Sequence, residues 1–351
     1  VRARAADLRG AIVLAMKPQA APIKEDRLQP TEHEQRVRIG APPNMPMDGP
    51  ADRRTLSTLL REVGAGVVLL PNQGEHGTIF VLGRRDTPDD APPTVVLAAE
   101  HYNMIVRMVE AGTPVTLRVN VVSRFHTQDT KSYNVLGDIP GTDPRIGDEV
   151  VLVGAHLDSW HSATGATDNA DASASLLEAM RILKALGARP RRTIRVALWG
   201  GEEQGLLGAR AHVAQHYGEA NPAARDKLSV YFNHDPGTGP IYGWYLEENE
   251  AVKPIFDAWL QPLQDIGARR NIMDRIGSTD HVAFVQVGLP GFNTVQDYVD
   301  YDVRTHHTNA DFAERLKPQD LQQAAIVLAT FAYQAAMRDG KIPRAAAVPD
   351  D

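Results

Sequence analysis

The strongest constraint on the fold is a regular alternation of buried strands and helices in the second part of the chain. Residues 149–156, EVVLVGAH, contain a continuous apolar run of the kind that lies in a parallel sheet covered on both faces. A helix is predicted over residues 170–186, and Gly187 ends it. Further strands are predicted at 192–200 and 227–235, and further helices at 250–266 and 318–340. This order predicts an α/β sandwich with a mostly parallel central sheet.

The first part of the chain has a different pattern. Short runs rich in Val, Ile and Leu predict four strands, at residues 11–16, 66–71, 78–83 and 94–99. Residues 17–50 carry many proline, charged and polar residues, and we interpret them as an irregular excursion, with a lid as one reading. The polar stretch RFHTQDTKSY marks a change of pattern. Because 351 residues are sufficient for two domains, we predict domains over 1–127 and 128–351.

Charge and composition exclude several classes of protein. Lys and Arg number 37 against 44 Asp and Glu, and no basic tract could neutralise a run of phosphates, so nucleic acid is not an expected partner. No apolar run approaches the roughly 18 residues of a membrane-spanning helix, so no membrane span is expected. The absence of cysteine excludes thiol catalysis and disulfides. Any transition metal must therefore bind through His, Asp and Glu.

Polar residues follow three of the predicted strands at the point where each strand ends. They are His156, Glu202, Glu203 and Asp235, and Asp168 lies in the turn that opens the helix after the first strand. Ligands of open α/β sheets bind outside the carboxyl ends of the strands, so these side chains are expected to cluster at one edge. Each has an ordinary structural explanation when taken alone, such as a helix N-cap at Asp168. Together, in a chain without cysteine, they favour a metal site.

The spacing of these residues suggests a division of roles. Asp158 is two residues after His156, so both project to one side of an extended chain. The Asp158 carboxylate is therefore expected to orient the imidazole rather than to bind metal. Glu202 and Glu203 are adjacent and project differently, so one can bind metal while the other moves a proton.

A last polar segment, RTHHTNADF at residues 304–312, contains His306 and His307. Adjacent residues of a regular strand do not both face one metal easily. At most one of the two is therefore expected to be a ligand.

Six ordered segments resemble the signature of a known family. They are HLDSW, GATDNA, ALWGGEEQG, NHDPGTG, GSTDH and HHTNAD, and the match spans Asn134 to about Ala335. The segments resemble the co-catalytic zinc exopeptidases that include bacterial aminopeptidases and plasma glutamate carboxypeptidase. This resemblance implies a three-layer sandwich, the zinc exopeptidase fold. The first part of the chain resembles the protease-associated domain of larger members, a smaller β-rich domain, which implies further sequence before Val1.

The resemblance also implies a site that holds two zinc ions. The implied ligands are His156 and Asp235 for one ion, Glu203 and His307 for the other, and Asp168 for both. His307 is preferred to His306 because His307, Thr308 and Asp311 match the family pattern His-Thr-x-x-Asp.

Further roles follow from the same resemblance. Glu202 would be the general base, and His306 would stabilise the oxyanion at a position where some relatives place a Tyr. A cis peptide bond is implied between Asp168 and Asn169.

A substrate-facing loop is implied by GSTDH, with Asp280 and His281 lining the pocket. A helix N-cap at Ser278 or Asp280 explains the segment equally well. Tyr301 is a candidate pocket wall, with ordinary packing as the alternative.

Three functions fit this sequence. The first is an exopeptidase that acts on peptides and releases N-terminal residues, and the second is a carboxypeptidase or dipeptidase of the plasma glutamate carboxypeptidase type. The third is an inactive receptor-like relative, which the intact ligand set and Glu202 disfavour. The resemblance also implies a secreted or periplasmic location. A homodimer through the protease-associated-like part is compatible with the sequence.

Overall fold

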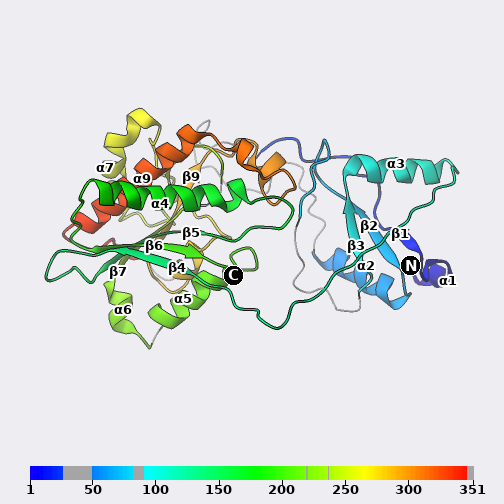
Figure 1. Cartoon of the computed structure of the whole chain (residues 1–351), viewed down its shortest axis with the longest axis horizontal. Coiled ribbons are helices and arrows are strands. Elements are labelled where there is room, and N and C mark those ends of the chain that lie inside the picture. Colours follow the sequence, from blue (N-terminus) through cyan, green and yellow to red (C-terminus); the bar gives the residue numbers. More distant parts are fainter. Residues whose placement is uncertain (27–49, 82–90, 219, 236, 346–351) are drawn as a thin grey trace. The chain divides into compact units, whose positions relative to one another are not determined.

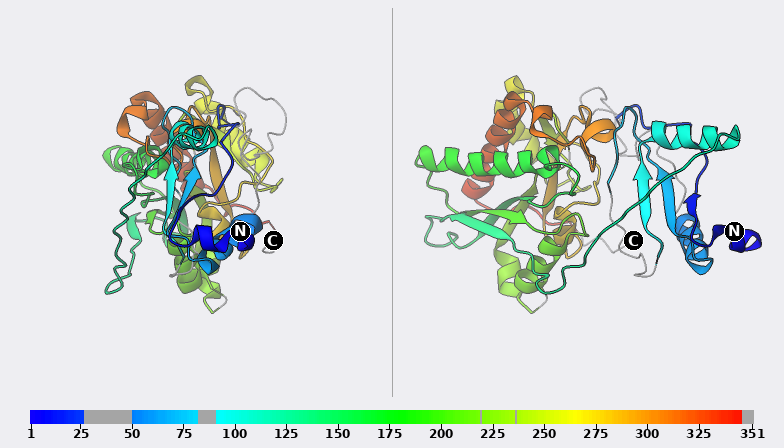
Figure 2. Two further views of the ribbon diagram at one scale, coloured as in Figure 1. Left: turned by 90° about the vertical axis from the view of Figure 1, so that its right-hand side faces the viewer. Right: turned by 45° about the vertical axis from the view of Figure 1, so that its right-hand side comes forward.

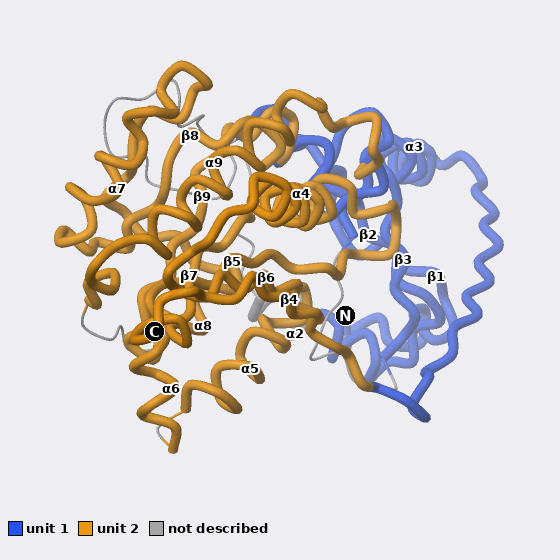
Figure 3. The backbone as a smooth tube through the Cα atoms, turned by 60° about the vertical axis from the view of Figure 1, so that its left-hand side comes forward, with its two compact units in different colours: residues 1–26, 41–130, 302–310 blue, residues 27–40, 131–301, 311–351 orange. Residues whose placement is uncertain are grey.

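The computed structural model describes residues 1–26, 50–81, 91–218, 220–235 and 237–345 (Figure 1, Figure 2). Most of the excursion at 17–50, and the end of the strand predicted at 78–83, lie outside these residues. The chain divides into two compact units (Figure 3). The first contains Val1–Asp26, Ala41–Thr130 and Asp302–Ala310, and the second contains Arg27–Gly40, Lys131–Tyr301 and Asp311–Asp351.

The second unit is built around a six-stranded sheet with the order β4-β6-β5-β7-β9-β8. Its strands are β4 (Val135–Ile139), β5 (Val150–His156), β6 (Thr193–Trp199), β7 (Leu228–Asn233), β8 (Ile241–Trp244) and β9 (Gly291–Gln296). The four central strands are parallel, while β4 and β8, at the two edges, run antiparallel to their neighbours. The predicted strands and the mostly parallel sheet are therefore confirmed.

Helices cover both faces of this sheet. They are α4 (Asp171–Ala185), α5 (Leu207–Tyr217), α6 (Pro222–Lys227), α7 (Lys253–Leu260), α8 (His281–Val285) and α9 (Pro318–Met337), with shorter turns η2 (Ala166–Ala170), η3 (Gln261–Ile266) and η5 (Ala313–Arg315). Helices α4, α7 and α9 lie on one side of the sheet, and α5 and α6 lie on the other (Figure 1). The predicted helix at 250–266 is divided, because Pro262 lacks the N–H that would continue α7.

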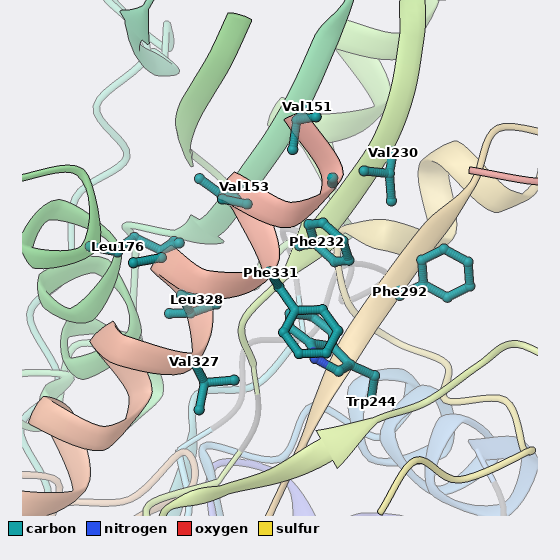
Figure 4. Close-up of a cluster of buried hydrophobic side chains, with 14 of the residues drawn as sticks. Val151, Val153, Leu176, Val230, Phe232, Trp244, Phe292, Val327, Leu328 and Phe331 are labelled. Atoms are coloured by element: carbon teal, nitrogen blue, oxygen red, sulfur yellow. The ribbon is translucent and has the colours of Figure 1, made fainter. Parts of the chain in front are cut away.

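Successive residues of the central strands pack into opposite layers, because side chains alternate along a strand. Val151 and Val153 of β5 pack in the core formed with α4, α7 and α9. Leu152 packs in a second core with α5 and α8. In the first core, Phe331 of α9 lies against Phe232 of β7 (Figure 4). These two cores confirm the three-layer sandwich.

An aromatic cluster on the second face contains a histidine. His212 of α5 is 4% exposed and packs against Trp199 and Tyr217, with ring centroids 5.0 and 5.6 Å away. Burial lowers the pKa of His212 to about 4, and the charges of His216 and Arg195 act in the same direction. The folded state therefore binds fewer protons than the unfolded chain as the pH falls from about 6.5 to about 4.

We expect His212→Phe to reduce the loss of stability in acid. At pH 5 a neutral buried imidazole costs about 2 kcal/mol relative to the unfolded chain, and Phe removes that cost while filling the cluster. Urea unfolding at pH 7.5 and 5.0 would measure the difference. The exposed control His126→Gln should keep the wild-type pH dependence. If His212→Phe lost as much unfolding free energy between pH 7.5 and 5.0 as the wild type, His212 would not contribute to the loss of stability in acid.

The first unit contains a three-stranded parallel sheet with α2 (Pro50–Glu62) on one face and α3 (Ala99–Glu110) on the other. Its strands, in spatial order, are β1 (Ile12–Leu14), β2 (Val67–Pro71) and β3 (Thr94–Leu97), and its other helices are η1 (Arg2–Arg4) and α1 (Ala5–Leu8). Leu60 of α2 packs with Val68 on one face, and Tyr102 of α3 packs with Leu69 on the other. Three of the four predicted strands are confirmed, whereas Phe80 forms only an isolated bridge to Thr308.

The resemblance of this unit to a protease-associated domain stays a prediction. Among the described residues, no helix combines the length and the apolar composition that are needed to cross a bilayer.

Candidate metal centre

Three predicted ligands of the second unit meet at the carboxyl edge of the sheet. His156 ends β5, Asp235 lies two residues beyond β7, and Asp168 lies in the turn η2. His156 Nε2 is 3.2 Å from Asp168 Oδ1 and 3.7 Å from Asp235 Oδ2. One ligand atom of each residue lies within 4.8 Å of the other two, and all three side chains are buried. This spacing leaves room for one metal ion about 2 Å from each atom.

The His156 ring is oriented by a backbone carbonyl. His156 Nδ1 lies 2.9 Å from the backbone oxygen of Asp158 and donates a hydrogen bond to it, so Nε2 faces the carboxylates of Asp168 and Asp235. The Asp158 carboxylate is 3.8 Å from Nδ1, too far for a hydrogen bond. The carboxylate is still within ion-pair distance of the ring, and its predicted role in orienting the imidazole stays a prediction. The hydrogen bond goes to the backbone oxygen because β5 ends at His156, so the extended-chain alternation does not continue to Asp158.

The Asp158 carboxylate instead holds the two glutamates that follow β6. Its Oδ1 accepts a hydrogen bond from the backbone N–H of Glu202 at 3.0 Å, and its Oδ2 accepts one from Glu203 at 3.2 Å. Two bonds to consecutive N–H groups fix the direction in which both side chains leave the backbone. Asp158 thus contacts the backbone of both glutamates, which the sequence did not predict.

Glu202 lies in a crowded acidic environment. Burial raises the pKa of Glu202 to about 9; the charge of His156 opposes this shift, and the carboxylates of Asp235, Asp280 and Glu203 add to it. A cation bound beside these carboxylates would favour their charged forms. The site is therefore short of positive charge.

The turn that carries Asp168 has a tightly determined backbone. Gly165 has a φ of +65°, and a Cβ there would lie 2.3 Å from the Ser159 side chain, so only glycine fits. The peptide bond between Asp168 and Asn169 is cis, as predicted. Asn169 Nδ2 donates to the backbone oxygen of His234 at 3.1 Å. Asp168 is not the N-cap of α4, because that position is occupied by Ala170.

Asp311 is a residue of this site to which the sequence assigned no role. Its Oδ1 accepts a hydrogen bond from the backbone N–H of Thr167 at 2.7 Å, and its Oδ2 accepts one from Asp168 at 3.2 Å. Its place in the family pattern was the one sequence feature that could have indicated a role. The contact joins residues 143 positions apart, so no local sequence pattern predicts it.

His306 and His307 belong to Asp302–Ala310, a part of the first unit. They follow the turn η4 (Tyr301–Thr305), and His307 has a φ of +58°. Their ring centroids are 3.8 Å apart, so a turn brings both rings to one side. The two residues do not lie in a regular strand, and the expectation that at most one of them is a ligand stays a prediction. The choice of His307 as ligand and of His306 as oxyanion partner stays a prediction.

The comparison with known proteins decides the family. The sequence model of peptidase family M28 matches residues 134–332, which is more than half of the chain. The chain belongs to peptidase family M28. The family resemblance of the six segments is thereby confirmed.

Three relatives of this M28 chain are informative. Carboxypeptidase Q of Rattus norvegicus is 32% identical over 252 residues, which are 72% of this chain and 51% of the rat protein. A peptidase M28 precursor from Shewanella amazonensis aligns with a TM-score of 0.64 and 27% identity, over 82% of this chain and 64% of that one. A zinc aminopeptidase from Bacillus subtilis, at 21% identity and a TM-score of 0.55 over 81% of this chain and 67% of that one, shares the fold. The chain spans about half the length of the curated relatives it matches.

The predicted substrate-binding residues of the M28 chain lie inside the protein. Asp280 and His281 are 0% exposed, and Tyr301 is 1% exposed. His281 Nε2 lies 3.2 Å from Glu247 Oε1, and Tyr301 packs near Tyr298 with ring centroids 6.4 Å apart. None of the three side chains is exposed, so their burial agrees with packing, and a contact of these residues with a peptide stays a prediction.

A buried hydrogen-bond network contacts the backbone oxygen of Asp235. The sequence did not predict this network. Asn293 Nδ2 donates to the backbone oxygen of Asp235, and Asn233 Nδ2 donates to Asn293 Oδ1 at 2.8 Å. Tyr231 Oη donates to Asn233 Oδ1, and Trp199 Nε1 donates to Tyr231 Oη at 2.7 Å. The polar residues within the fully buried strands β7 and β9 are the sequence feature that could have indicated the network.

The metal-ligating groups of this site are of the types that bind zinc. Imidazole and carboxylate are the zinc ligands left to a chain without cysteine. Asp280 is fully buried, neither carboxylate oxygen has a hydrogen-bond partner among the described residues, and burial raises its pKa to about 8. Its charge acts on Glu202, so the acidic cluster extends beyond the three ligands. A divalent cation supplies the charge that such a cluster needs.

Proposed function

We propose that this chain carries the catalytic part of a zinc exopeptidase, an enzyme that hydrolyses the terminal peptide bond of a peptide. The observation that carries the proposal is the buried cluster of His156, Asp168 and Asp235 at the carboxyl edge of the sheet of an M28 chain. Glu202, held by Asp158, stands at the same edge. A metal-binding cluster with a free carboxylate beside it suits hydrolysis by an activated water.

The proposed metal complement is two zinc ions. His156 and Asp235 would hold one ion, Glu203 and His307 the other, and Asp168 both. Support comes from the surplus of buried carboxylates at this edge of the sheet. When bound, zinc polarises a carbonyl oxygen and lowers the pKa of a bound water.

The residues of the chain would divide the remaining work. Glu202 would take a proton from the attacking water and deliver it to the amine that leaves. Asp158 would hold Glu202 in place through the backbone bond at 3.0 Å. His306 would donate a hydrogen bond to the oxygen on which negative charge develops.

The terminus of the substrate defines two candidate activities. We place the release of N-terminal residues first, and its support is the fold shared with the Bacillus subtilis zinc aminopeptidase. Hydrolysis at the C-terminus or of dipeptides is the second candidate, and the higher identity to Carboxypeptidase Q supports it. The secreted or periplasmic location and the homodimer are proposals that rest on the resemblance alone.

Peptides with blocked termini distinguish these activities. We expect the zinc-loaded protein to release single residues from peptides with a free N-terminus, and N-terminal acetylation to abolish the reaction. Mass spectrometry of the products would measure this. Loss of cleavage upon C-terminal amidation would identify a carboxypeptidase, and cleavage of dipeptides alone would identify a dipeptidase. No cleavage of any peptide would overturn the proposed function.

A further inference from the structure

Asp311 binds the backbone of the turn that carries the proposed ligand Asp168. Its side chain is buried, with 4% exposure, and both carboxylate oxygens are used: one for the N–H of Thr167 and one for the N–H of Asp168. Its own backbone oxygen accepts hydrogen bonds from Thr164 N and Thr164 Oγ1, each at 3.1 Å. Four hydrogen bonds therefore connect one residue to the segment that leads to Asp168.

A carboxylate at this position has an electrostatic cost. Burial raises the pKa of Asp311, hydrogen bonds from Thr167 oppose the shift, and the negative charge of Asp168 adds to it. An asparagine would avoid this repulsion. It would, however, offer one acceptor and one donor, and the donor would face an N–H group. An aspartate is therefore required only if both backbone N–H groups must be held.

Holding both N–H groups controls the Asp168 carboxylate. The bond to Asp168 N fixes the residue whose Oδ1 lies 3.2 Å from His156 Nε2. The bond to Thr167 N fixes the preceding peptide plane, so the turn cannot rotate about Asp168 alone. Metal affinity depends on such outer contacts, and their loss typically costs about 10- to 100-fold in affinity or activity.

We propose that Asp311 is a positioning residue of the metal centre, which sets the place of the Asp168 carboxylate by binding the backbone N–H groups of Thr167 and Asp168. The proposal rests on the proposed function, because it assumes that Asp168 binds metal. Asp311 also follows His307 by four residues in the chain.

Three variants test this role. Asp311→Ala removes both acceptors, Asp311→Asn keeps one, and Thr164→Val removes a hydrogen bond to the same residue without changing its carboxylate. Zinc affinity would be measured by competition with a chromophoric chelator, and the melting temperature of each zinc-free protein would be measured in parallel. We expect affinity to fall about 100-fold in Asp311→Ala, about 10-fold in Asp311→Asn and less than 2-fold in Thr164→Val.

The graded loss separates positioning from charge. Both Asp311 variants remove one negative charge, so a purely electrostatic role predicts equal losses and would overturn the proposal. Wild-type affinity in Asp311→Ala would overturn it as well. If Asp311→Ala does not fold, the comparison of Asp311→Asn with Thr164→Val decides. A wild-type protein that binds no zinc would instead refute the proposed function, which makes the two failures distinguishable.

Discussion

Glu202→Gln is expected to lower kcat by about 10³-fold while zinc binding stays at the wild-type level. Glutamine has nearly the same shape but cannot accept the proton of the attacking water. The backbone bond from Glu202 to Asp158 does not involve the altered side chain, so the turn should keep its geometry. KM should change little, because the lost interaction belongs to the transition state. Steady-state kinetics with parallel zinc analysis would measure both effects.

Two controls accompany this prediction. Glu178→Gln makes the same chemical change on the exposed side of α4, where Glu178 pairs with Arg181 at 2.7 Å, and should leave kcat within about twofold of wild type. Glu203→Gln should lower zinc affinity, in line with its proposed role as ligand. If Glu203→Gln kept its zinc and lost kcat while Glu202→Gln lost zinc, the two roles would be reversed.

The mostly parallel sheet and the sheet edge at which the candidate site lies could both be predicted from the sequence. Buried parallel strands are largely apolar, so the polar residues that follow them mark where they end. His156 ends β5, and Asp235 lies two residues beyond β7. The carboxyl ends of parallel strands share one edge, which made the clustering predictable without coordinates.

Side-chain directions beyond the strand ends could not be predicted. Asp158 lies past the last residue of β5, where alternation no longer applies, and its carboxylate turns to the backbone of Glu202. His306 and His307 follow a turn rather than a strand. Burial of Asp280 depends on packing between elements that are far apart in sequence, which a local pattern does not record.

Asp168→Ala is expected to lower kcat/KM by about 10³-fold or more and to weaken zinc binding. Asp168 is the ligand proposed for both ions, and its Oδ1 lies 3.2 Å from His156 Nε2. The loss should not come from unfolding. Burial raises the pKa of Asp171, and the charges of Asp311 and Asp168 add to this shift, so removal of Asp168 relieves some repulsion between carboxylates. The same change removes the carboxylate that lies 3.2 Å from His156 Nε2. Because these two effects oppose each other, the zinc-free variant should melt close to the wild-type temperature, as scanning calorimetry would show.

A wild-type melting temperature combined with full activity in Asp168→Ala would contradict the role of Asp168 as a zinc ligand. A low melting temperature would show instead that the residue is needed for the fold, and Asp168→Asn, which keeps the side-chain volume, would then be the variant to assay.

Zinc titration of the chelator-treated wild-type protein tests the central claim most directly. Terminal residues released from a peptide would be counted at each addition of zinc. The proposed centre predicts no release without metal and a rise that saturates at two zinc ions per chain. Release at the full rate from the metal-free protein would contradict the proposed zinc exopeptidase.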